Sequence, residues 1–222
     1  MLSALTGLLL GAWHVVSGPD HLAAVTPLVL GPDHGHDPRA PLSNDRGHAR
    51  IGLAWGLGHA SGVWLVGLVL LAFGSLIPLE LVGVWSERIV GVAIVAVGIW
   101  GLWRVRHNWG TDESHDHDHD HGHQHHAGAG SRSALGIGLL HGVAGSSHLY
   151  GLLPALALAA SERVSYLIGF GIGSIVAMGL FAGLLGLVVG RLPGSKATVR
   201  RWTLLVASIA AVIIGTAWVL YS

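Results

Sequence analysis

The chain has 222 residues, of which 51% are hydrophobic and only 11% are charged, and its mean hydropathy is +0.60. Soluble domains carry about 25% charged residues, so this composition excludes an ordinary soluble protein and indicates a membrane protein. The formal net charge is zero, which gives no reason to expect a nucleic-acid partner. The chain has no cysteine, which excludes disulfides and thiolate metal sites, but it has 16 histidines.

Apolar stretches of about 20 residues predict six membrane-spanning helices. These are expected at residues 2–30, 50–76, 82–104, 133–159, 164–190 and 201–221. The first stretch is too long for one straight span, and we expect it to break near residues 17–19, where proline removes a backbone donor. The nine tryptophans are expected mostly at the membrane interfaces.

Two polar stretches separate the apolar segments, at residues 31–49 and 105–132. The second contains the low-complexity sequence SHDHDHDHGHQHH, which cannot form a packed core. The chain therefore divides into a first half at 1–104, a histidine-rich loop at 105–132 and a second half at 133–222.

The positive charges predict the orientation of these helices, because cytoplasmic connections are enriched in Lys and Arg. Of the 12 Lys and Arg residues, ten lie in or beside the first, third and fifth connections between the predicted helices. The other two lie at the opposite side of the membrane. This distribution predicts a cytoplasmic histidine-rich loop and places both termini outside a cytoplasmic (inner) membrane.

The two halves share a sequence repeat. HVVSGPDHLAAVTP at 14–27 matches HGVAGSSHLYGLLP at 141–154 without a gap, and WGLGHASG at 55–62 matches FGIGSIVA at 170–177. An odd number of spans in each half would insert the halves in opposite orientations. The predicted fold is therefore an all-α polytopic membrane protein with six transmembrane helices arranged as two inverted three-helix repeats.

Histidines and one aspartate lie inside the predicted spans, where polar groups are costly and mark functional sites. Imidazole and carboxylate ligands suit divalent transition metals. We therefore predict a metal site made by His14, Asp20, His21 and His59. His141 and His148 repeat the spacing of His14 and His21 without an accompanying carboxylate. They are either further ligands, a proton relay or relics of a duplication.

The loop between the halves offers many further imidazoles, interleaved with aspartates. Such a segment suits collection of borderline cations without selecting among them. We predict that its histidines collect metal: His115, His117, His119, His121, His123, His125 and His126.

HVVSGPDHLAAV at 14–25 resembles the His-Asp-His signature of the nickel/cobalt transporter family and its urease-accessory permease relatives, and LGHASGV at 57–63 resembles that family's second signature. The resemblance implies that His14, Asp20, His21 and His59 select the metal. The chain differs from the uptake members of this family in two features. Five residues rather than four separate His14 from Asp20, and six spans are evident rather than eight. The chain also resembles the family's efflux branch, which has fewer spans and a histidine-rich loop.

We therefore expect a membrane transporter, not an enzyme, that moves Ni²⁺ or Co²⁺, with Zn²⁺ as a third candidate ion and with no resident cofactor. Uptake is favoured, and efflux fed by the histidine-rich loop is the alternative. A membrane-embedded zinc enzyme and a metal-storage scaffold are weaker alternatives. The expected partners are the metal ion and the lipid bilayer, and homo-oligomerisation is left open.

Overall fold

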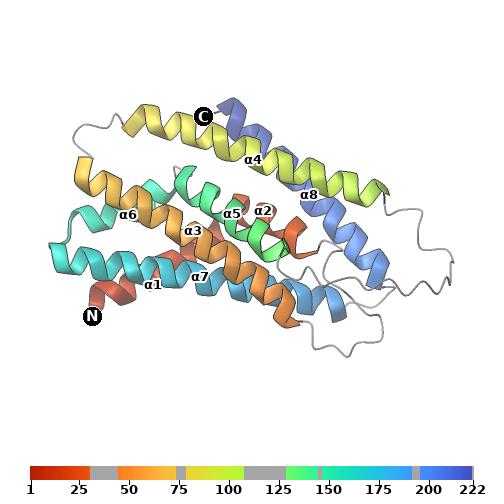
Figure 1. The fold of residues 1–222 in the computed structure, drawn as a ribbon, viewed down its shortest axis with the longest axis horizontal. Coiled ribbons are helices and arrows are strands. Elements are labelled where there is room, and N and C mark those ends of the chain that lie inside the picture. The colour runs from red at the N-terminus through yellow and green to blue at the C-terminus, as the bar shows by residue number, and fades with distance from the viewer. Residues whose placement is uncertain (31–44, 74–78, 108–128, 145–146, 192–195, 222) are drawn as a thin grey trace.

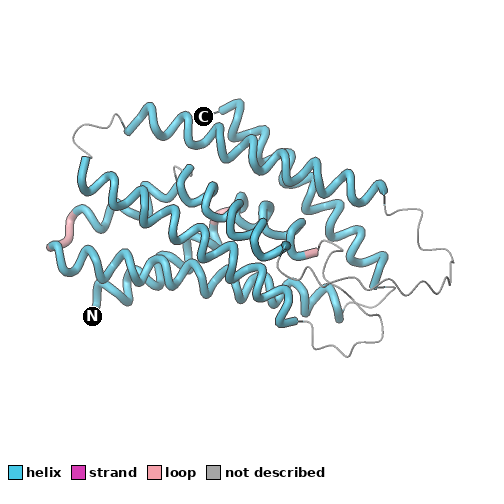
Figure 2. The backbone as a smooth tube through the Cα atoms, in the orientation of Figure 1, coloured by secondary structure: helices cyan, strands magenta, loops and turns pink. Residues whose placement is uncertain are grey.

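A computed structural model describes residues 1–30, 45–73, 79–107, 129–144, 147–191 and 196–221. Within these residues all regular structure is helical (Figure 2). The helices are α1 (Leu2–Ser17), α2 (Pro19–Val29), α3 (Asp45–Phe73), α4 (Leu79–His107), α5 (Ala129–Ala144), α6 (Ser147–Leu156), α7 (Ala160–Arg191) and α8 (Lys196–Tyr221).

Four of these helices are long and apolar enough to cross a membrane. They are α3, α4, α7 and α8, and the bent pair of α1 and α2 makes a fifth candidate if it counts as one span. Large apolar side chains cover the outside of the bundle, including Leu68, Leu180 and Val206, each more than half exposed. In a bilayer this surface faces lipid, so the protein is an all-helical, multi-pass membrane protein.

The long helices α3, α4, α7 and α8 lie roughly along one long axis (Figure 1). α3 begins and α7 ends at one end of the bundle, next to the end of α4 and the start of α8. We call this the connection end, because the helix ends that flank residues 31–44, 108–128 and 192–195 all lie there. The opposite end, where α1 and α7 begin, is called the far end. α3 and α7 run in opposite directions, as do α4 and α8 (Figure 1).

Close backbone contacts repeat between the halves. A Cβ atom on Gly11 of α1 would collide with the carbonyl oxygen of Phe170 in α7, and a Cβ atom on Gly138 of α5 would collide with that of Trp55 in α3. The sequence repeat places Gly11 over Gly138 and Trp55 over Phe170. The two contacts are therefore equivalent.

A second pair of glycine contacts also lies at equivalent positions of the repeat. A Cβ atom on Gly173 would collide with the carbonyl oxygen of Leu8, and a Cβ atom on Gly58 would collide with that of Leu135. Small residues at such positions let the backbones of membrane helices approach closely. The first helix of each half thus packs on the second helix of the other half, which brings residues of both halves to the centre of the bundle.

The segment predicted as one span at 133–159 is described as two helices, α5 and α6, on either side of residues 145 and 146. The other predicted spans correspond to α3, α4, α7 and α8, which extend a few residues further than expected at most of their ends. Charged residues at the helix ends account for this difference, because an apolar-window criterion stops where charges begin while the helix continues.

Candidate metal centre

The break between α1 and α2 creates the centre of the molecule. Gly18 is extended, with φ −87° and ψ 103°, and Pro19 opens α2 at a position where its missing N–H costs no helix hydrogen bond. The two helices meet at 72°. A side chain on Gly18 would occupy the space of the His21 ring and the Asp20 carboxylate. Glycine at the break therefore leaves room for the polar side chains that follow it.

The bend, rather than one face of a straight helix, brings His14 and His21 together. Seven residues along a straight helix span about 10 Å, whereas the two ring centroids lie 4.7 Å apart. A spacing of seven residues predicts that both lie on one face of an unbroken helix, but they belong to two helices that meet at Gly18.

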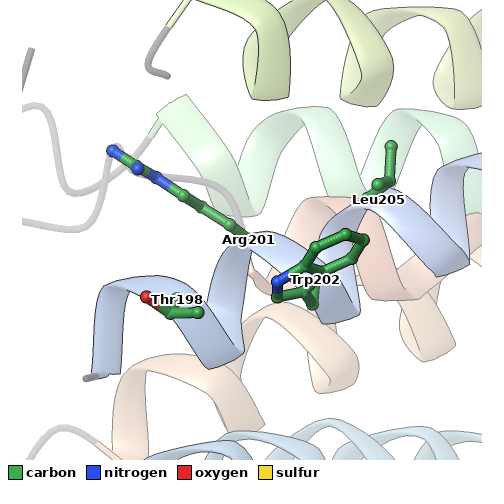
Figure 3. Close-up of a pocket in the computed structure, with 4 residues that line it drawn as sticks. All are labelled: Thr198, Arg201, Trp202 and Leu205. Carbon is green, nitrogen blue, oxygen red and sulfur yellow. The ribbon is translucent and has the colours of Figure 1, made fainter. Parts of the chain in front are cut away.

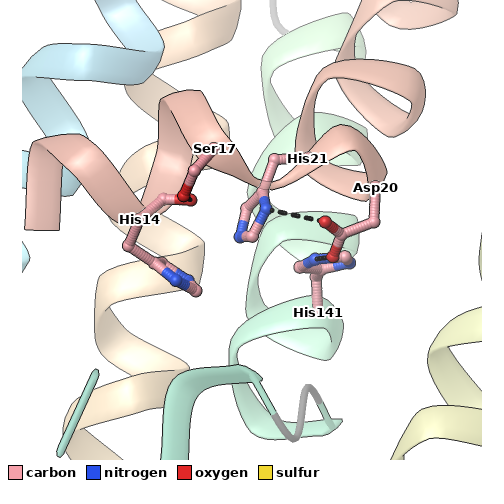
Figure 4. Close-up of polar contacts among 5 residues, drawn as sticks. All are labelled: His14, Ser17, Asp20, His21 and His141. Carbon is pink, nitrogen blue, oxygen red and sulfur yellow. Dashed lines mark hydrogen bonds and ion pairs between the residues drawn. The ribbon is translucent and has the colours of Figure 1, made fainter. Parts of the chain in front are cut away.

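Asp20 joins the two halves of the chain (Figure 4). One carboxylate oxygen, Oδ1, lies 3.1 Å from Nδ1 of His21, and the other, Oδ2, lies 3.0 Å from Nε2 of His141. All three side chains are buried. A carboxylate thus accompanies His141 after all. It is supplied by α2 of the first half, which the sequence repeat could not reveal.

His59 completes a cluster of imidazoles around this pair. Its ring centroid lies 5.1 Å from that of His21 and 5.8 Å from that of His14. His14, His21 and His59 each offer a ring nitrogen within 4.8 Å of the others, and Asp20, His21 and His141 form a second such group. His21 belongs to both groups, so the two form one continuous cluster.

The hydrogen bonds of Asp20 decide which ring nitrogens can bind a cation. An ionised carboxylate only accepts hydrogen bonds, so Nδ1 of His21 and Nε2 of His141 are the donors. The lone pairs then lie on Nε2 of His21 and Nδ1 of His141. Metal-binding histidines commonly donate their other N–H to a carboxylate, which fixes the tautomer and the ring orientation. The cluster therefore has the chemistry of a site for a divalent cation.

The geometry also suits a small cation. Ligands of a tetrahedral site about 2.0–2.1 Å from the metal lie about 3.4 Å from one another. The ring nitrogens of the three-histidine group are within 4.8 Å of one another, so small side-chain rotations would close them on an ion. His59 reaches this position because Gly142 of α5 packs directly under its backbone carbonyl.

Sequence reasoning overlooked Trp55, which the structure places against the cluster. Its indole is fully buried and stacks on the His59 ring at 5.1 Å and 11°. It also contacts His21 at 5.7 Å and His141 at 5.3 Å. The spacing of four residues between Trp55 and His59 puts both on one helix face and was the available signal, but most tryptophans were expected at the membrane interfaces.

The remaining predicted residues lie elsewhere or outside the described residues. His148 belongs to α6, but its side chain is outside the described set, as are the loop histidines at 115–126. Ser174 of α7 stands where the repeat aligns His59, and its hydroxyl donates to backbone carbonyls of Phe170 and Gly11. The second half thus lacks a histidine at this position.

A pocket lies on α8 (Figure 3). It is lined by Thr198, Arg201, Trp202 and Leu205, all from the start of that helix. None of these residues belongs to the histidine cluster.

The fold and the cluster define a class: a multi-pass helical membrane protein with a buried histidine–aspartate centre at a broken helix. Comparison with known families is more specific. The chain belongs to the family described as cytochrome C biogenesis protein transmembrane region, whose model matches residues 33–217.

Three curated proteins are similar to the chain. Chloroplast protein FOR GROWTH AND FERTILITY 2 of Arabidopsis thaliana is 30% identical over 197 residues, which cover 84% of this chain and 47% of that protein. Chloroplast protein FOR GROWTH AND FERTILITY 1 is 29% identical, with 97% of this chain and 58% of that protein covered. The chain therefore spans about half the length of these two relatives.

The third relative is the urease accessory protein UreH of Bacillus sp. (strain TB-90). It is 29% identical over 194 residues, covering 84% of this chain and 78% of that protein. No solved structure matches the chain.

Proposed function

We propose that the protein transports a divalent transition-metal ion, Ni²⁺ or Co²⁺, across the membrane through the buried histidine–aspartate cluster. The observation that carries this proposal is the convergence of His14, His21 and His59 beside the Asp20 carboxylate. Neutral imidazoles bind such ions, and one carboxylate compensates part of the charge. An ionisable residue inside a membrane protein is energetically costly, and such residues usually mark functional sites.

Each polar residue has a separate role in this proposal. His14, His21 and His59 bind the ion through ring nitrogens. Asp20 orients His21 and His141 and supplies the negative charge that favours a cation in a low-dielectric site. His141 of α5 contacts His21 and Asp20, so the second half supports the ion's ligands from behind.

The proposed architecture is an inverted repeat of two three-helix halves, with α1 and α2 forming one broken span and α5 and α6 the other. The equivalent glycine contacts and the opposite directions of α3 and α7 support this interpretation. In such transporters the site lies near the midplane on broken helices, and one half moves against the other. The Asp20–His141 contact crosses between the halves in this way.

The distribution of positive charge supports a location in the cytoplasmic (inner) membrane, with the connection end facing the cytoplasm. Both termini would then lie outside. Arg50, Arg104 and Arg191 lie near the connection end, whereas Arg88 and Arg163 lie near the far end. An inside-negative potential of about 100 mV favours entry of two charges by about 4.6 kcal/mol. Uncoupled transport would therefore be uptake.

One of the relatives supports a metal-related membrane role. The similarity to a urease accessory protein fits the urease-accessory permeases among the transporters that the sequence resembles. Efflux is the second candidate, because the histidine-rich loop would supply ions from the cytoplasmic side. A zinc hydrolase is less well supported, because it would need a carboxylate that is free to act as a general base. Among the described residues, the carboxylate of the cluster is that of Asp20, and histidines contact both of its oxygens.

Proteoliposomes loaded with a metal-sensitive dye would test the proposal, with the voltage and the pH gradient set independently. We expect Ni²⁺ or Co²⁺ entry that follows the voltage in the unmodified protein and is lost in the His59→Ala variant. His107→Gln is the matched control, because His107 is exposed at the end of α4. Equal transport by His59→Ala and the unmodified protein would contradict the proposal.

A further inference from the structure

Two aromatic side chains contact opposite sides of the histidine cluster. Trp55 of α3 contacts His141 at 5.3 Å, and Phe170 of α7 contacts His14 at 5.5 Å. The sequence repeat aligns Trp55 with Phe170 and His14 with His141. The two ring contacts are therefore equivalent in the two halves.

Each ring also reaches the helix that follows a break. Trp55 contacts His21 of α2 at 5.7 Å. A Cβ atom on Gly151 of α6 would lie 2.9 Å from the tip of the Phe170 ring. Trp55 thus lies between α5 of the second half and α2 of the first half. Phe170 lies between the equivalent helices, α1 of the first half and α6 of the second half.

The two rings are displaced from each other along the bundle. Gly56, the neighbour of Trp55, packs against Ile175 of α7. Ile175 is five residues nearer the connection end than Phe170, which corresponds to about 7–8 Å along the helix. Trp55 is therefore on the connection side of the cluster, and Phe170 is on the far side.

Both rings are buried against the cluster in the structure, since Trp55 is 0% exposed and Phe170 is 1% exposed, while His14 is partly exposed. The closed position of Trp55 also has a cost. Its indole N–H is buried and has no hydrogen-bond partner among the described residues, and an unsatisfied buried donor is destabilising. Rotation of the indole toward water would satisfy this group.

We propose that Trp55 and Phe170 are the two gates of the site, Trp55 toward the connection end and Phe170 toward the far end. This inference rests on the proposed transport function. Opening one ring while the other stays closed would expose the cluster to one side of the membrane at a time. In the structure both rings are in the closed position against the cluster. The two gates differ in size, because the repeat has an indole ring at Trp55 and a phenyl ring at the equivalent position, Phe170.

Thiol labelling tests the gates without relying on metal movement. The chain contains no cysteine, so His59→Cys places a single thiol in the middle of the cluster. A small membrane-impermeant methanethiosulfonate reagent is added to either side of metal-free vesicles. Arg50→Cys and Ser161→Cys, each exposed at one end of the bundle, identify the two sides.

We expect slow labelling of His59→Cys from both sides. Adding Trp55→Ala should raise the rate about tenfold from the connection end alone, because the lost ring contacts shift the population toward the open gate. Adding Phe170→Ala should give the same increase from the far end alone. Trp64→Ala in α3 and Phe181→Ala in α7 are matched controls that remove a ring away from the cluster, and they should leave both rates slow.

Labelling that rises equally from both sides, or from the side opposite to the one predicted, would overturn the gates. If an alanine variant does not fold, Trp55→Leu and Phe170→Leu retain apolar volume and should show the same sidedness with a smaller increase. Unchanged rates in folded leucine and alanine variants would also overturn the inference. Equilibrium dialysis of Ni²⁺ with the unmodified protein separates the two hypotheses. Sided labelling without Ni²⁺ binding would reject the metal function, whereas Ni²⁺ binding without sided labelling would reject the gates.

Discussion

Asp20 and His141 are hydrogen-bonded to each other across 121 positions of sequence, with Oδ2 and Nε2 3.0 Å apart. Asp20 belongs to α2 of the first half and His141 to α5 of the second half. The same carboxylate contacts His21 through its other oxygen. A single buried charge therefore organises imidazoles from both halves, and the predictions below depend on this arrangement.

His141→Ala should weaken Ni²⁺ binding about 10- to 100-fold, the usual cost of removing an outer partner of a metal-binding group. The variant removes the imidazole that holds the second carboxylate oxygen, so Asp20 orients His21 less firmly. Isothermal titration calorimetry on the purified protein would measure this, with His107→Ala as the control. Unchanged affinity in His141→Ala would show that this contact is only structural.

Asp20→Asn should abolish transport while the protein still folds. Asparagine retains the size of the side chain and one acceptor oxygen, but it replaces the other oxygen with an NH₂ donor and removes the charge that compensates the ion. Because a central aspartate costs about 2.5–3.5 kcal/mol on insertion scales, the variant should be as stable as the unmodified protein or more stable. Vesicle transport and thermal unfolding in detergent test the two parts, and transport at the normal rate would be the contrary result.

Metal binding should weaken as the pH falls from 7.5 to 5.5. The ordinary pKa of histidine is about 6.5, and protonation occupies the nitrogen that would bind the metal. The loss should therefore grow as the pH falls and be reversed when the pH is raised again. Ni²⁺ affinity measured by dialysis across this range would reveal the trend, and a flat profile would argue against a site dominated by imidazoles.

Gly138→Ala should destabilise the protein, whereas Gly136→Ala on the same helix should not. A Cβ atom at Gly138 would collide with the backbone carbonyl of Trp55, but at Gly136 it would meet no atom within 4 Å. Forced overpacking typically costs about 1–3 kcal/mol. Unfolding midpoints in the same detergent would compare the two variants. Equal stability would mean that α3 and α5 can separate without loss.

Deletion of residues 115–126 should leave the metal preference unchanged. The tract contains seven histidines with many overlapping ligand combinations, which gives no geometry for discrimination. Transport should change mainly at low metal concentration, where a high local concentration of ligands matters most. For an exporter, efflux at low cytosolic metal should fall. For an importer, net accumulation should fall while the initial rate barely changes. A deletion that alters which ion is moved would place selectivity in the loop.

The sequence alone determined the class of protein and the chemistry of the site. Low charge and long apolar segments require a bilayer, because such segments have no other solvent in which to be stable. His14, Asp20, His21 and His59 could be selected because polar groups in apolar segments are conspicuous. The repeat pointed to His141, and Gly18 with Pro19 indicated the break through local backbone chemistry alone.

Only the tertiary structure decided which groups meet. The contacts of Asp20 with His141, and of Trp55 with His21 and His141, join segments far apart in the chain. They depend on how closely α3 and α5 approach at Gly58, Gly138 and Gly142. Periodicity reports which face of a helix is apolar, but it does not report which other helix covers that face. That choice is made by packing among all the helices at once, so the partner of the buried carboxylate and the aromatic residues that enclose the cluster came from the structure.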